Sequence, residues 1–149
     1  FDAFRLPFYK ELQKSKDETL SGLALKAVKE TTYHLQHSSN WVIRLGDGTD
    51  ESHKRLTTAL EDLWMFTGEL FYSDEVDTKL VNEGIAVDVN KIKPIWDAKV
   101  SEVFAQANLQ IPDNDWMQKG GRQGRHSEYL GFILSEMQYM QRAYPGSEW

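Results

Sequence analysis

Cysteine is absent from the 149 residues of this chain, and proline occurs only 4 times. Without cysteine the chain forms no disulfide, thiolate zinc site or iron–sulfur cluster, and it has no thiol nucleophile. No apolar run approaches the roughly 18 residues that a membrane-spanning helix needs, so we do not expect a membrane protein. The net charge of −6 argues against a general nucleic-acid binder, because such proteins attract phosphates with excess positive charge.

The composition that is present is that of an ordinary globular domain. Hydrophobic residues make up 40% of the chain and charged residues 27%, which is too apolar for a disordered segment. A chain of this length buries roughly two thirds of its unfolded surface in one domain. No repeat, low-complexity tract or linker divides it, and its first residues lack the pattern of a signal peptide. We therefore expect a single domain over residues 1–149.

Apolar residues recur at spacings of three and four along nearly the whole chain, and no alternating strand pattern competes with them. The fold class that this pattern predicts is all-α. The predicted helices cover about 1–14, 15–46, 50–71, 74–82, 91–107 and 127–144, with an extended stretch at 109–112 and a long loop at 113–126. Ser15 and Glu18 form a predicted capping box for the second helix, and Gly46 is expected to end it. Pro7 indicates either a helix start near Leu6 or a kink in the first helix.

Large apolar side chains in helical register are expected to form the core of the domain. They include Trp41, Trp64, Trp96 and, on the inward face of the last helix, Leu130, Ile133, Leu134, Met137 and Met140. Trp116 and Trp149 lie near polar loops instead. Exposure of these two tryptophans would indicate a surface for a partner.

The second predicted helix has a polar patch in the middle of its apolar face. Glu30, Thr31, His34 and Ser38 fall within that face. Helical bundles build di-iron sites with Glu-x-x-His, but Thr31 stands three residues before His34, and no Glu-x-x-His occurs in the chain. We favour a buried histidine that a carboxylate or hydroxyl satisfies, because burying either group alone is costly. Metal ligation by Glu30 and His34 is the alternative.

A second candidate site is a basic, glycine-rich segment just before the last predicted helix. It carries Lys119, Arg122, Arg125 and His126 among three glycines. Cations beside flexible glycines and a helix N-terminus could hold a phosphate or a carboxylate of a partner. A solvated loop explains the same composition, and the sequence leaves both interpretations open.

Several blocks of the sequence are long enough to be compared with known families. They are AVKETTYHLQHS at 27–38, WVIRLGDGT at 41–49, LWMFTGELF at 63–71, EGIAVD at 83–88, GGRQGRHSEYLG at 120–131, EMQY at 136–139 and PG at 145–146. In this order, over the whole chain, they resemble the family of structural, C-type subunits (PaaC) of bacterial phenylacetyl-coenzyme A 1,2-epoxidase. Such collinear blocks are far more specific than any short motif.

The resemblance implies a ferritin-like helical bundle, of which this chain is the C-terminal portion without the family's N-terminal helices. It also implies a non-catalytic subunit that binds and stabilises the catalytic, A-type subunit. That partner holds two irons and epoxidises the ring of phenylacetyl-CoA, with oxygen and a reductase fed by NADPH, in aerobic phenylacetate catabolism. This chain would then have no catalytic residue, metal or cofactor of its own. It would act in the cytoplasm with the A-type and other epoxidase subunits, and a homodimer is left open.

The resemblance further implies that Asp2 occupies a position where a bundle carboxylate could face Glu30 and His34. We expect these three residues to form a vestigial, metal-free polar cluster. Two other hypotheses stay open. A di-iron carboxylate oxygenase acting alone would need at least four converging carboxylates and two imidazoles. A stand-alone helical interaction module would need no site at all.

Overall fold

The computed structural model describes residues 1–113 and 116–148. In this part of the chain it contains helices and no strand, which confirms the all-α prediction. The contacts divide the chain into two compact units, Phe1–Gln118 and Lys119–Trp149, and we describe each unit by itself. The expected single domain stays a prediction. No helix among the described residues has the length and apolar character needed to cross a bilayer.

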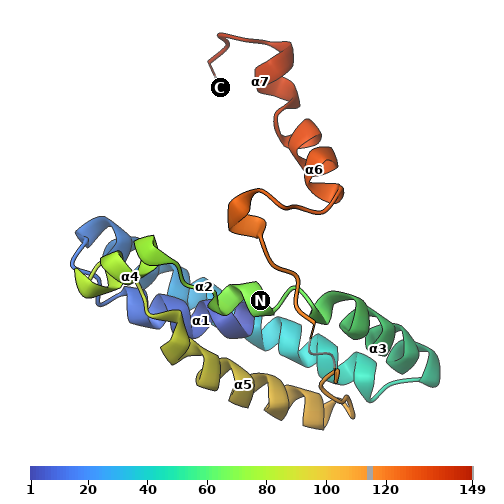
Figure 1. The fold of residues 1–149 in the computed structure, drawn as a ribbon. Helices are drawn as coiled ribbons and strands as arrows, with labels where there is room; N and C mark the ends of the chain where they lie inside the picture. Colours follow the sequence, from blue (N-terminus) through green and yellow to red (C-terminus); the bar gives the residue numbers. More distant parts are fainter. Residues whose placement is uncertain (114–115, 149) are drawn as a thin grey trace. The chain divides into compact units, whose positions relative to one another are not determined.

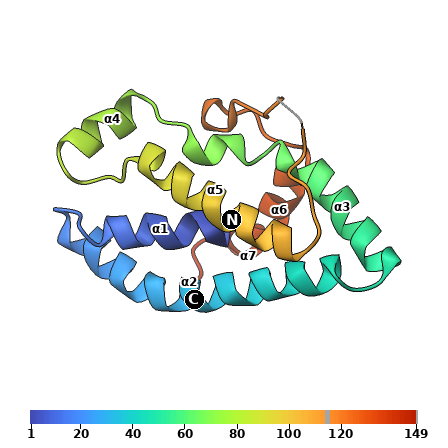
Figure 2. The same ribbon diagram turned by 90° about the horizontal axis from the view of Figure 1, so that it is seen from below.

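The first unit is built around α1 (Asp2–Leu12), which packs between two longer helices. These are α2 (Glu18–Gly46) and α5 (Val89–Gln106), and α1 lies between them in Figures 1 and 2. α3 (Asp50–Trp64), the 3₁₀ helix η1 (Gly68–Phe71) and α4 (Glu75–Asn82) complete the unit. α2 ends at Gly46 as expected, where a side chain would collide with the backbone of Ala107 at the end of α5.

An aromatic cluster fills the core between α3, η1 and α5. The ring centroids of Trp64 and Trp96 lie 5.6 Å apart, and Phe71 meets Trp96 edge to face at 5.3 Å. Phe104 adds a further ring 6.1 Å from Trp64. Trp64 and Trp96 are buried, which confirms them as core residues. Trp41 is 49% exposed, so its expected place in the core is wrong.

Two predicted helix boundaries are corrected by local hydrogen bonds. The carboxylate of Asp17, and not the hydroxyl of Ser15, caps α2 by accepting from the backbone N–H of Leu20 at 2.9 Å. The Ser15 hydroxyl instead donates to the carbonyl of Ile85 at 2.7 Å, a contact between segments far apart in the sequence. The predicted 50–71 helix ends at Trp64, where the Thr67 hydroxyl donates to the Trp64 carbonyl and a 3₁₀ turn follows.

The second unit consists of a short 3₁₀ helix, η2 (Gly121–Gln123), followed by α6 (Tyr129–Met137) and α7 (Tyr139–Ala143). The expected inward face of the last helix is not buried by the second unit itself, because most of its side chains are exposed there. The exposed fractions are 54% for Ile133, 38% for Leu134, 71% for Met137 and 43% for Met140, and Leu130 is half-buried. Two helices this short supply too little apolar surface to bury one another's faces.

Candidate functional site

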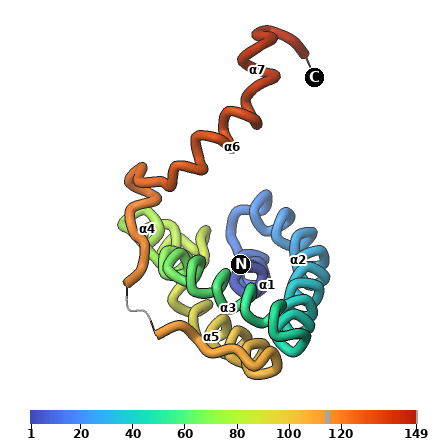
Figure 3. The backbone as a smooth tube through the Cα atoms, turned by 90° about the vertical axis from the view of Figure 1, so that its right-hand side faces the viewer, coloured from blue at the N-terminus to red at the C-terminus, as the bar shows by residue number. Residues whose placement is uncertain are grey.

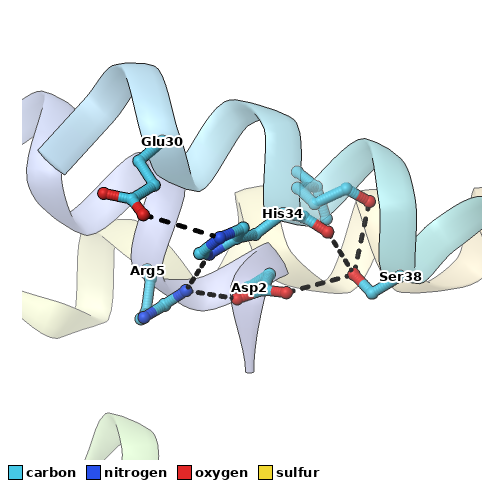
Figure 4. A network of polar contacts seen from close by, with 6 residues as sticks. Asp2, Arg5, Glu30, His34 and Ser38 are labelled. Atoms are coloured by element: carbon cyan, nitrogen blue, oxygen red, sulfur yellow. Dashed lines mark hydrogen bonds and ion pairs between the residues drawn. The ribbon is translucent and has the colours of Figure 1, made fainter.

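The polar patch predicted on α2 faces the first turns of α1. Figure 4 shows the side chains of Asp2 and Arg5 on α1 directed toward those of Glu30, His34 and Ser38 on α2. The spacing of three on α1 and of four on α2 places each set on one side of its helix. The antiparallel packing of the two helices therefore assembles residues separated by about thirty positions in the sequence.

The guanidinium of Arg5 is the centre of this polar cluster. Its Nη2 donates to Oδ1 of Asp2 at 2.7 Å and to Nδ1 of His34 at 3.1 Å. The hydroxyl of Ser38 donates to the other carboxylate oxygen of Asp2 at 3.1 Å. The side chains of Asp2 and Arg5 are only 20% and 26% exposed, so solvent screens this ion pair incompletely.

The contact with Arg5 fixes the tautomer of His34. A guanidinium only donates hydrogen bonds, so Nδ1 of His34 must accept and carry no proton. The tautomer that accepts this bond carries its ring proton on Nε2. Nε2 points toward Oε1 of Glu30 at 3.9 Å, too long for a hydrogen bond. Glu30 is also 77% exposed and lies at the edge of the cluster.

The structure brings the three predicted residues, Asp2, Glu30 and His34, into one region, but an unpredicted residue lies at the centre of the cluster. Asp2 and His34 are joined through Arg5, which sequence reasoning missed, and Glu30 lies beside them. The signal that could have found Arg5 is its position three residues after Asp2, since opposite charges at that spacing meet on one side of a helix. The vestigial character of the cluster stays a prediction.

The residues around His34 do not fit the ligand set of a di-iron centre. Within residues 1–113 and 116–148, no group of three or more His, Cys, Asp or Glu side chains is placed to hold a metal. Thr31, one turn before His34, is buried at 3% exposure and carries no carboxylate. The cation of Arg5 lies between Asp2 and His34, where a second positive charge would be repelled.

The basic segment of the second unit forms a closed turn. Gly120 and Gly124 adopt left-handed backbone angles, with φ of 101° and 81°. The carbonyl of Gly120 accepts from the backbone N–H groups of Gln123 and Arg125, at 3.0 and 2.9 Å. Lys119, Arg122, Arg125 and His126 lie on or beside this turn, and all four residues are exposed. A phosphate or partner contact by these four residues stays a prediction.

Exposure of Trp116 and Trp149 was the expected sign of a partner surface, and the structure describes only the first of them. Trp116 is 57% exposed, as expected. Trp149 lies outside the described residues. The exposure of Trp116 is consistent with a partner surface and does not identify the partner.

Helices that turn carboxylate, imidazole and hydroxyl groups toward one another define a helical-bundle protein with a partly exposed polar cluster at a helix interface. The model of the family described as "Phenylacetic acid catabolic protein" (PaaA_PaaC) matches residues 1–149, and the chain belongs to that ferritin-like helical family. The chain is 43% identical over 148 residues to the C-type subunit of the 1,2-phenylacetyl-CoA epoxidase of Escherichia coli (strain K12). The match covers 99% of this chain and 60% of that relative's length.

Proposed function

We propose that this chain is a non-catalytic, structural subunit of a 1,2-phenylacetyl-CoA epoxidase in aerobic phenylacetate catabolism. In this role it binds and stabilises the catalytic, A-type subunit and contacts the other epoxidase subunits in the cytoplasm. The oxygen- and NADPH-dependent chemistry then belongs to the di-iron centre of the catalytic subunit. The proposal is supported by membership of the family and by the similarity to the C-type epoxidase subunit of Escherichia coli.

The non-catalytic part of the proposal rests on one observation, the position of Arg5 between Asp2 and His34. The guanidinium occupies the Nδ1 lone pair of His34 and one oxygen of Asp2, two atoms that could otherwise ligate a metal, and it places a positive charge between them. Three charged or polar side chains from two helices are thus held together without a metal. The cluster stabilises the packing of α1 on α2, which is a structural role.

The binding part of the proposal is supported by exposed apolar side chains in the first unit. Large hydrophobic residues are more than half exposed on three different helices: Leu23 at 59%, Leu25 at 61% and Tyr33 at 65% on α2, Leu63 at 62% on α3, and Ile95 at 51% on α5. Single exposed hydrophobics are normal, and these side chains are apolar surface that a partner could cover. Burying them against the catalytic subunit would hold that subunit's helices in place.

Co-purification with iron analysis tests both parts together. We would co-express the chain with the other epoxidase subunits of the same organism, isolate the complex through a tag on this chain, and measure iron in each separated subunit. We expect a stable complex with iron in the catalytic subunit and none bound to this chain. Near two irons per copy of this chain, or no complex at all, would contradict the proposal. Omitting this chain should also abolish oxygen- and NADPH-dependent turnover of phenylacetyl-CoA.

A further inference from the structure

The outer side of α2 carries a continuous line of stacked rings. Tyr33, His37 and Trp41 follow at intervals of four residues, which places them on one side of the helix. The rings of Tyr33 and His37 are stacked with centroids 6.1 Å apart, and His37 meets Trp41 edge to face at 6.4 Å. Tyr33 is 65% exposed and Trp41 is 49% exposed. α2 forms an outer edge of the first unit in Figures 2 and 3.

Cations flank these rings at both ends. Lys26 and Lys29 precede the rings on the same side of α2, and Arg44 follows them. The guanidinium carbon of Arg44 lies 6.0 Å from the centroid of Trp41, and all three basic side chains are exposed. We call these three cations and three rings the α2 stripe. Between residues 19 and 46 the sole acidic residue is Glu30, although the chain as a whole carries a net charge of −6.

The α2 stripe is already organised for binding. The rings are held by one another and by a regular helix, so binding a partner orders few additional side chains. Tyrosine, tryptophan and arginine, three of the residue types in this stripe, are typical of the residues that contribute most to protein interfaces. The distance along the helix from Lys26 to Arg44 is about 27 Å at 1.5 Å per residue. This length corresponds to about five turns of a partner helix.

From this pattern we infer that the α2 stripe binds an acidic, amphipathic helix of a partner epoxidase subunit. Apolar side chains of that helix cover Tyr33 and Trp41, and carboxylates near its two ends meet Lys26 and Lys29 at one end and Arg44 at the other. The inference rests on the proposed function, since it assigns the surface and the chemistry of the partner. Three cations against the single carboxylate of Glu30 give this side of α2 a net positive charge on an acidic chain, which favours a partner of opposite charge.

A second copy of this chain fits the α2 stripe less well. Two copies that met here about a twofold axis would place like charges together in either helix direction. Antiparallel copies of α2 would bring the two lysines of one copy near Arg44 of the other, and parallel copies would pair each cation with itself. The net charge of −6 on each chain would add a further repulsion.

Binding measurements on the complex test the α2 stripe. The affinity of the full chain for the separately purified epoxidase subunits would be measured for the wild type, for Trp41→Ala and for the double variant Lys29→Glu with Arg44→Glu. We expect each change to weaken binding by about tenfold or more, as for a central interface residue. Wild-type binding should also weaken with added salt, and the double variant should lose most of that salt dependence.

Matched variants elsewhere provide the controls. Tyr72→Ala removes an aromatic ring that is 48% exposed, nearly the same as Trp41, and Lys54→Glu reverses an exposed charge on α3. Both should bind as the wild type does, and circular dichroism would show that every variant keeps its helices. A photo-crosslinker in place of Tyr33 should label an Asp- or Glu-rich helical segment of the partner.

The outcomes separate the inference from the proposed function. If the wild type binds no epoxidase subunit, the proposed function fails and the inference fails with it. If the wild type binds while the stripe variants keep their affinity, the inference alone is overturned. A crosslink to a basic segment or to a second copy of this chain overturns it as well.

Discussion

The two units of this chain contain similar apolar side chains but bury them to different extents. In residues 1–118, the rings of Trp64 and Trp96 are 8% and 6% exposed and lie against Phe71 and Phe104. In α6 of the second unit, Phe132 and Met137 are 69% and 71% exposed. The difference shows that the first unit has a core of its own, whereas the apolar residues of the second unit are not buried by that unit.

The largest expected effect comes from breaking the core of the first unit. Trp96→Ala removes a ring in contact with Trp64 and Phe71 and leaves a cavity, so the free energy of unfolding should fall by about 3–5 kcal/mol. Chemical denaturation followed by circular dichroism measures this change. The matched variant Met137→Ala in α6 should change the same free energy by less than about 0.5 kcal/mol. Equal losses for both variants would contradict the comparison.

A smaller effect is expected from the ion pair between Asp2 and Arg5 on α1, because Arg5 also contacts His34 on α2. Arg5→Met keeps a similar stem but removes the guanidinium, so Oδ1 of Asp2 and Nδ1 of His34 lose their donor. We expect a loss of about 1–3 kcal/mol in the free energy of unfolding, measured by the same chemical denaturation.

The control for Arg5 is a second arginine pair with the same distance. Arg55 and Glu51 on α3 also lie 2.7 Å apart, but their side chains are 80% and 66% exposed. Arg55→Met should therefore cost less than about 1 kcal/mol, because solvent screens the pair. A larger loss for Arg55→Met than for Arg5→Met would show that burial does not determine the strength of these contacts.

The sequence was sufficient for the all-α class and for the residues of the polar patch that lie on α2. Spacings of three and four residues identify a helix and its apolar face, and they placed Glu30, His34 and Ser38 on one side of α2. The contact between Arg5 and His34 could not be predicted in the same way, because these residues meet only after α1 has packed against α2. Local patterns contain no information about that packing, so the centre of the cluster was missed.

The same limit explains why the expected inward face of the last helix is not covered within its own unit. Periodicity shows which face of a helix is apolar, but not whether another element covers that face. Met137 and Met140 keep helical register in the sequence and are exposed in the structure. The choice of helix cap failed for a local reason, because Ser15 and Asp17 are both good capping residues two positions apart. The contact of Ser15 with the distant Ile85 carbonyl decides between them.

Helix capping gives a second, smaller contrast between the units. Asp17→Ala removes the acceptor for the Leu20 N–H at the start of the long helix α2, and should lower the free energy of unfolding by about 1 kcal/mol. Glu128 precedes α6 and forms no side-chain cap, so Glu128→Ala should leave stability nearly unchanged. Thermal unfolding of both variants measures the difference. A destabilised Glu128→Ala variant would mean that the start of α6 contributes to folding stability.

The smallest effect on stability is expected at the basic turn of the second unit, where a change in binding is predicted instead. Replacing Lys119, Arg122 and Arg125 together by alanine should leave the unfolding of the first unit unchanged, because that unit has its own core. If the turn holds a phosphate group or a carboxylate of a partner subunit, the triple variant should bind it more weakly, with the largest difference at low salt where charges are least screened. Titration with inorganic phosphate and with the purified epoxidase subunits, each at two salt concentrations, distinguishes the two ligands. Unchanged affinity for both would identify the segment as a solvated loop and would leave the α2 stripe as the basic surface to test.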